Sequence, residues 1–151
     1  MKKEDKQTSE KVSAAVLKES KKIEIMKFDK PEVQKDRILM RTENCGVCGT
    51  DIHIYEGRMT VPYPIIPGHE FVGKIEEIGE IARTLEIKGQ ALTEGDLITV
   101  VPGTNLFCGK CYYCRFLPHK PNLCTNRRAY GVSMSCKDPP HLFGGWSEYL
   151  Y

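Results

Sequence analysis

Four cysteines close together in the second half of the chain restrict its fold more than any other feature. The first three are separated by two residues each and the fourth follows after nine more, as Cys108, Cys111, Cys114 and Cys124. Four thiolates complete a tetrahedral shell around Zn²⁺ with no open position, which makes a site that organises a loop and does not react. The spacing of two lets backbone amides point at the sulfurs, and Gly109 relieves the tight turn. The segment predicts a structural zinc site.

Two other interpretations of the cysteines are weaker. An iron–sulfur cluster also takes four cysteines, but its characteristic runs have other spacings. A zinc ribbon can bind nucleic acid, yet the net charge is only +2 and the basic residues form no stripe. The nearby cations offset the negative charge of the thiolates; they are Lys110, Arg115, Lys120, Arg127 and Arg128. We therefore expect no nucleic-acid partner.

The remaining composition indicates a soluble protein of the cytoplasm. The chain has 151 residues, enough for one domain, and no apolar run long enough for a signal peptide or a membrane span. Seven cysteines is an odd number, and thiols of a cytosolic protein more often hold metal than form disulfides.

A second candidate metal site lies upstream. Its two segments are CGVCGTDIH at residues 45–53 and PGHE at residues 67–70. A catalytic zinc needs three protein ligands and an open position, and a thiolate with an imidazole suits it, so Cys48 and His69 form the natural pair. Asp51 is placed to fix an imidazole tautomer, and Thr50 supplies a hydroxyl one step from the bound oxygen.

Two competing motifs in this region fail on their context. Cys45 and Cys48 form a C-x-x-C, but no βαβ pattern surrounds them, as a thioredoxin-like redox site would require. Residues 68–75 match most of a phosphate-binding P-loop but lack the Ser or Thr that holds Mg²⁺.

The hydrophobic pattern predicts a mainly β domain with short helices. Residues 1–12 are expected to be a disordered lead-in, and residues 13–151 the folded domain. Short alternating segments bounded by Gly and Pro predict strands of an antiparallel β-barrel; they fall at residues 23–25, 38–42, 70–78, 97–101 and 146–151. Only residues 80–90 have a helical pattern. The G-x-G-x-x-G of a dinucleotide-binding unit is missing.

In their order, these motifs resemble the zinc-containing medium-chain alcohol dehydrogenase family. CGVCGTDIH, PGHEFVG, Gly95-Asp96, the three-cysteine run and GGWSEY at residues 144–149 carry the resemblance, which covers about residues 13–151. It implies a GroES-like β-barrel with a four-cysteine zinc lobe, a catalytic and a structural zinc, and oxidation of a small alcohol or polyol with NAD or NADP. It also implies that the complete protein is a homo-oligomer.

The resemblance assigns roles to individual residues. Cys48 and His69 match two ligands of the catalytic zinc, and Glu70 matches a neighbouring carboxylate that approaches or replaces a ligand. Thr50 and His53 match a proton relay that passes the cofactor ribose, so both are expected to contact the cofactor. The structural zinc falls to the four clustered cysteines, with Cys124 the least secure because the family more often leaves seven residues before it. Cys45 and Cys136 match no ligand, and His119 and His141 are expected to face solvent.

The same resemblance places the third catalytic ligand, a Cys, Glu or Asp, beyond Tyr151, together with the Rossmann cofactor domain. This chain alone is therefore expected to be inactive. The alternative is a free-standing zinc-binding barrel that acts as a structural or interaction module, with one tightly held metal and no cofactor binding.

Overall fold

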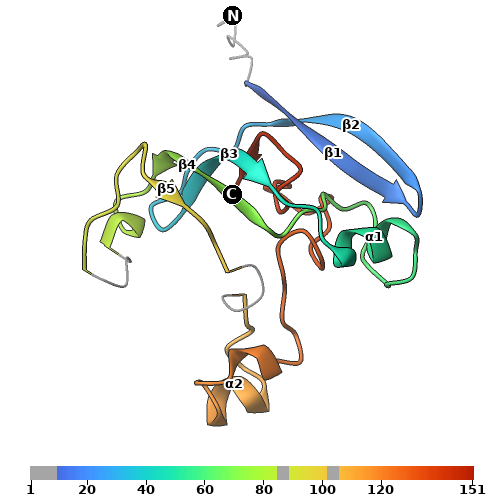
Figure 1. Ribbon diagram of the computed structural model, residues 1–151. Helices are drawn as coiled ribbons and strands as arrows, with labels where there is room; N and C mark the ends of the chain where they lie inside the picture. Colours follow the sequence, from blue (N-terminus) through green and yellow to red (C-terminus); the bar gives the residue numbers. More distant parts are fainter. Residues whose placement is uncertain (1–9, 85–88, 102–105) are drawn as a thin grey trace, which may run out of the picture.

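A computed structural model describes residues 10–84, 89–101 and 106–151 of the chain. Most of its regular structure is β (Figure 1). The strands are β1 (Lys11–Glu19), β2 (Lys22–Asp29), β3 (Ile38–Cys45), β4 (Phe71–Ile78), β5 (Leu97–Ile98) and β6 (Tyr149–Leu150). The helices are α1 (Gly49–Tyr55) and α2 (Tyr112–Phe116), with single 3₁₀ turns η1 (Ala82–Thr84) and η2 (Pro121–Leu123). The predicted class, mainly β with short helices in a GroES-like domain, is confirmed.

The strands form two antiparallel sheets. β1 and β2 make a hairpin, and the second sheet has the order β5-β4-β3-β6. Isolated bridges join them, since Ala14 of β1 pairs with Ser147 just before β6 and Leu17 pairs with Ile65. The segment before β6 therefore lies between the hairpin and the larger sheet. Backbone hydrogen bonds hold residues 65–70 between the two sheets. Ile65 pairs with Leu17 of β1, and the carbonyl of Glu70 accepts the N–H of Gly46 just after β3.

Strand positions follow the hydrophobic pattern, with one correction at the start. β2 to β6 each overlap a predicted segment, but β1 is not among the predicted strands, and it begins at Lys11, two residues before the expected start of the domain. Val12, Ala14 and Val16 point inward from β1 and are at most 2% exposed. Val12 therefore belongs to the core and not to a lead-in. Residues 1–9, which carry the rest of that prediction, lie outside the described residues.

The prediction that only residues 80–90 are helical is wrong. That segment contains just the turn η1, with residues 85–88 outside the description, whereas α1 and α2 form elsewhere. Both true helices are too short to show a repeating apolar face, which is the signal that periodicity detects. Capping starts α1 instead, and α2 lies inside the cysteine cluster.

The core places α1 against the hairpin. Leu17 of β1, Ile54 of α1 and Ile65 form one cluster, and each is fully buried. A second cluster on the larger sheet contains Met40, Phe71 and Leu150. α1 is thus anchored by one apolar side chain, Ile54, which leaves its polar residues free to form a site.

Among the described residues, no helix has the length and apolar character needed to cross a membrane.

The four-cysteine lobe, residues 108–124, lies apart from the sheets. Figure 1 shows α2 and its flanking loops projecting below the rest of the fold. Its helix α2 contacts η2, the other element of the lobe. The lobe has little apolar core of its own, because Tyr112 and Phe116 are both about two-thirds exposed (65% and 67%). Something other than hydrophobic burial must organise it.

Candidate functional site

We call Cys48, Asp51 and His69 the barrel site. Its first half, Cys48 and Asp51, lies where β3 passes into α1. Cys48 is the N-cap of α1, and its Sγ accepts a hydrogen bond from the backbone N–H of Thr50 at 3.3 Å. Asp51 completes a capping box by accepting the backbone N–H of Cys48 at 3.0 Å. These two hydrogen bonds fix Cys48 at the start of α1.

His69 is positioned by a tight segment just before β4. Gly68 has φ of +88°, and a Cβ on it would lie 2.5 Å from Trp146 Cδ1 and 2.7 Å from Cys45 Sγ. The carbonyl of Gly68 accepts the N–H of Gly145 at 2.8 Å. Only glycine fits here, since it alone tolerates both the left-handed backbone and the close approach. The imidazole that follows is therefore aimed by a rigid turn.

The two halves meet at a distance that suits one metal ion. Cys48 Sγ and His69 Nε2 are 3.1 Å apart. In a tetrahedral zinc site, bond lengths of about 2.3 Å to sulfur and 2.1 Å to nitrogen separate such a pair by roughly 3.6 Å. The ligand atoms of Cys48, Asp51 and His69 all lie within 4.8 Å of one another. The donor set and its spacing fit zinc.

Asp51 supports the site from behind. Its side chain is 0% exposed, and one oxygen accepts the N–H of Gly68 at 3.2 Å while facing His69 Nδ1 at 3.5 Å. That nitrogen is buried and has no hydrogen-bond partner among the described residues at ordinary distance. A buried carboxylate facing Nδ1 favours the tautomer that leaves Nε2 free to bind a metal. Sequence reasoning named Asp51 for this purpose, and the geometry agrees.

The other predicted site residues lie around this pair without joining it. Thr50 and His53 are three residues apart on α1, with Thr50 half-buried and His53 exposed. Glu70 follows His69 but is exposed, and it is not part of the group of potential metal ligands. Its carboxylate lies instead beside the backbone of Gly46. The ligand role of Glu70 and the relay roles of Thr50 and His53 stay predictions.

The four clustered cysteines converge as their spacing predicts. Cys111 Sγ is 3.5 Å from that of Cys114 and 4.0 Å from that of Cys124, and Cys108 and Cys114 are 4.0 Å apart. Sulfurs at the corners of a zinc tetrahedron are roughly 3.8 Å apart. Cys124, the least secure of the four in the sequence, is in place and buried, and its Sγ accepts the N–H of Cys108 at 3.4 Å.

Backbone amides prepare these sulfurs for a cation. Hydrogen bonds from the amides of Cys114 and Thr125 lower the pKa of Cys111 to about 6, so this thiol is a thiolate at neutral pH. Desolvation and the neighbouring thiols raise the pKa of Cys114 to about 12, because a second negative charge beside the first is unfavourable. The cluster therefore holds fewer than four negative charges until a metal displaces the remaining protons.

The remaining cysteines and histidines take structural positions, with one correction. Cys136 is buried and Cys45 is half-buried against Gly68 and Gly145. His119 is exposed, as expected. His141 does not simply face solvent, because its ring stacks on Phe28 at 5.5 Å and its Nδ1 lies 2.9 Å from the carbonyl of Cys136. A lone histidine in a loop gives no signal for such packing.

Known proteins share these features. A family model described as the alcohol dehydrogenase GroES-like domain matches residues 34–151. D-arabinitol dehydrogenase 1 of Uromyces fabae is 32% identical over 138 residues, which are 91% of this chain and 34% of that enzyme. An alcohol dehydrogenase of Geobacillus stearothermophilus is 34% identical over 141 residues, 91% of this chain and 36% of the enzyme.

Solved structures agree. The crystal structure of an alcohol dehydrogenase from Thermotoga maritima superposes with a TM-score of 0.82 at 34% identity, over 94% of this chain and 38% of that one. The chain thus spans little more than a third of the length of the relatives that it matches. With the matched region covering most of its length, this chain belongs to the alcohol dehydrogenase family and contains its GroES-like domain.

Proposed function

We propose that this chain is the catalytic-domain portion of a zinc-dependent oxidoreductase, which oxidises an alcohol or polyol with NAD or NADP. The observation that carries the proposal is the 3.1 Å approach of Cys48 Sγ to His69 Nε2, backed by the buried Asp51. Its relatives include a D-arabinitol dehydrogenase, an alcohol dehydrogenase and several L-threonine 3-dehydrogenases, which supports oxidation of a substrate hydroxyl group.

Cys48 and His69 would hold the catalytic zinc, with Glu70 as the neighbouring carboxylate. When bound, the zinc supplies Lewis-acid chemistry that favours loss of the hydroxyl proton from the substrate. Asp51 keeps the imidazole of His69 in the tautomer whose Nε2 is a ligand. The four-cysteine lobe would hold a second zinc that is purely structural, because four thiolates leave no open position.

Thr50 and His53 would move the released proton to water. They share one face of α1, with Thr50 next to Cys48 and His53 at the exposed end of the path. An imidazole accepts and releases protons near neutral pH, which suits the outer position. Contact with the cofactor falls to the same two residues. We expect no turnover from residues 1–151 alone, because they span little more than a third of the dehydrogenases that they match, and the resemblance assigns the third ligand and the cofactor domain to the remainder.

The proposal is tested by hydride transfer in the complete protein. Reduction of NAD or NADP is followed with a panel of primary alcohols, secondary alcohols and polyols. Cys48→Ser should lower kcat/KM by about a thousandfold or more, because it removes a zinc ligand. Cys45→Ser, three residues away and outside the ligand group, is the matched control and should keep most of the activity. Absence of oxidation of every alcohol by the zinc-loaded protein would favour the free-standing structural module instead.

The proposed proton relay of Thr50 and His53 is tested separately, by the pH dependence of kcat in the complete protein. His53→Ala should slow turnover mainly at low pH, where water and hydroxide accept the proton poorly and the imidazole matters most. His119→Ala removes an exposed histidine of the four-cysteine lobe and serves as the control. A pH profile of kcat that His53→Ala leaves unchanged would remove His53 from the relay while leaving the metal assignment intact.

A further inference from the structure

Charge is distributed very unevenly around the four-cysteine lobe. Residues 97–137 contain no Asp or Glu but six basic side chains, namely Lys110, Arg115, Lys120, Arg127, Arg128 and Lys137. Four thiolates around one Zn²⁺ leave a net charge of about −2, so neutralising the cysteines accounts for only part of this excess. Within the described part of the chain, none of the six forms an ion pair.

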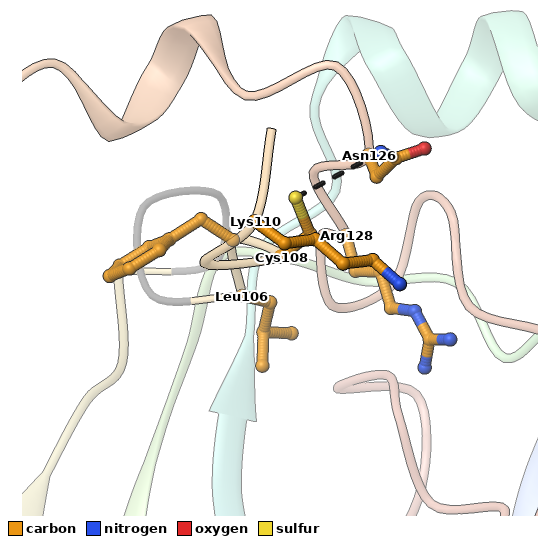
Figure 2. A pocket seen from close by; sticks show the side chains of 6 residues that line it. Leu106, Cys108, Lys110, Asn126 and Arg128 are labelled. Atoms are coloured by element: carbon orange, nitrogen blue, oxygen red, sulfur yellow. Dashed lines mark hydrogen bonds between the residues drawn. The ribbon is translucent and has the colours of Figure 1, made fainter. Parts of the chain in front are cut away.

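Two of these cations line one pocket of about 600 Å³ at the edge of the lobe. Among the described residues, its wall contains no acidic side chain and is formed by Leu106, Phe107, Cys108, Lys110, Asn126 and Arg128. In Figure 2 the side chains of Lys110 and Arg128 extend toward the same side of this pocket, while the sulfur of Cys108 points to Asn126. The two cations therefore face the pocket and not the cysteine sulfur.

The backbone holds this arrangement in place. Leu106 and Arg128 form a β-bridge, with the N–H of Arg128 donating to the carbonyl of Leu106 at 2.9 Å. The side-chain amide of Asn126, another lining residue, donates to Cys108 Sγ at 3.9 Å, which links this side chain to the cysteine cluster. Lys110 and Arg128 line the pocket and have no ion-pair partner among the described residues, so both are available for a ligand.

We propose that this pocket binds the phosphate group of a small organic phosphomonoester. A guanidinium fork and an ammonium together suit a tetrahedral dianion, whose two charges match the two cations. Phe107, which is 50% exposed, offers an apolar ring for the organic part of the ligand. The pocket volume is within the range of small-molecule sites. This site is separate from Cys48 and His69 and does not depend on the hydride-transfer proposal.

Phenyl phosphate is a suitable probe, with benzoate and phenol as the carboxylate and neutral arms. The zinc-loaded chain is titrated at constant ionic strength, by calorimetry and by the NMR shifts of the Asn126 side chain and the Leu106 amide. Phenyl phosphate should bind with one-to-one stoichiometry, more tightly than benzoate, while phenol should not bind measurably. Benzoate binding equal to phenyl phosphate binding would overturn the choice of phosphate.

Variants separate a built site from general attraction to a basic surface. Lys110→Gln and Arg128→Gln should each weaken phenyl phosphate binding about fivefold, as expected for a lost charged hydrogen bond at a partly exposed site. Lys110→Arg should restore binding. Lys120→Gln removes a cation of the same lobe that does not line the pocket, and it should leave the affinity unchanged. The proposal is wrong if Lys120→Gln has the same effect as Lys110→Gln, or if phenyl phosphate does not bind at millimolar concentration. Zinc content measured for every variant confirms that the lobe is intact.

Discussion

Asp51 connects the two halves of the barrel site through three contacts of one carboxylate. One oxygen accepts the N–H of Cys48, while the other accepts the N–H of Gly68 and faces His69 Nδ1. A fully buried carboxylate is costly unless hydrogen bonds satisfy it, and here backbone amides on both sides of the site do so. The same side chain therefore starts α1, holds the turn before His69 and orients the imidazole.

Asp51→Asn should weaken metal binding at the barrel site by about 10- to 100-fold, because the carboxylate that orients the imidazole is lost. The asparagine amide would also direct an N–H group at backbone N–H donors, because both oxygens of Asp51 accept hydrogen bonds. The measurement is competition for Zn²⁺ with a chelating dye. Asp36→Asn, at an exposed carboxylate, is the control. Equal zinc affinity in Asp51→Asn and the unmodified chain would show that Asp51 only caps α1.

α1 positions most of the candidate residues of the barrel site. It carries Thr50 and His53 on one face and the two buried residues, Asp51 and Ile54, on the other. Its start was not recognisable from periodicity, because seven residues give fewer than two apolar repeats. The residues that cap it, Cys48 and Asp51, are predicted from the sequence only as candidates for metal chemistry. The β-strands are easier to predict, because β3 and β4 are eight residues long and alternation over part of each strand is enough to indicate them.

Ile54→Ala tests how α1 is anchored. Ile54 is fully buried against Leu17 and Ile65, so the truncation should lower the free energy of unfolding by about 2–5 kcal/mol. Zinc affinity at the barrel site should fall as well, since Cys48 and Asp51 move with the helix. Ile52→Ala, at a half-exposed position on the same helix, should cost less than about 1 kcal/mol. Urea unfolding of the zinc-loaded chain measures the free energy of unfolding of both variants. Similar losses for the two variants would mean that α1 does not rely on this cluster.

The chain as a unit combines two sites with different organising forces. The barrel site is embedded in hydrogen-bonded sheets and hydrophobic clusters, whereas the lobe exposes its aromatic side chains and has its four sulfurs at its centre. Metal binding to such a segment is itself folding free energy. The two sites should therefore respond differently when a ligand is removed.

Metal analysis of two variants checks this difference. Cys48→Ser should lose one zinc and keep the far-ultraviolet spectrum and the unfolding midpoint nearly unchanged. Cys111→Ser should lose the other zinc and increase hydrogen exchange across residues 108–124, because the lobe has no core to replace the metal. If both variants lost the same zinc, the chain would contain one metal centre and not two.

Ligand types, their spacing and the period of the strands could all be read from the chain, because each depends on neighbours a few residues apart. The spacing of the four cysteines predicts that their sulfurs converge, and the alternation of apolar and polar residues predicts most of the strands. The meeting of Cys48 with His69, the burial of Asp51 between them and the exposed position of Glu70 depend on how β3, α1 and the turn before β4 pack together. Such contacts join residues that are distant in sequence, and the folded backbone sets their distances. For the same reason, the sequence indicates only that the cations beside the lobe act as counter-charges, whereas the fold shows that Lys110 and Arg128 line one pocket.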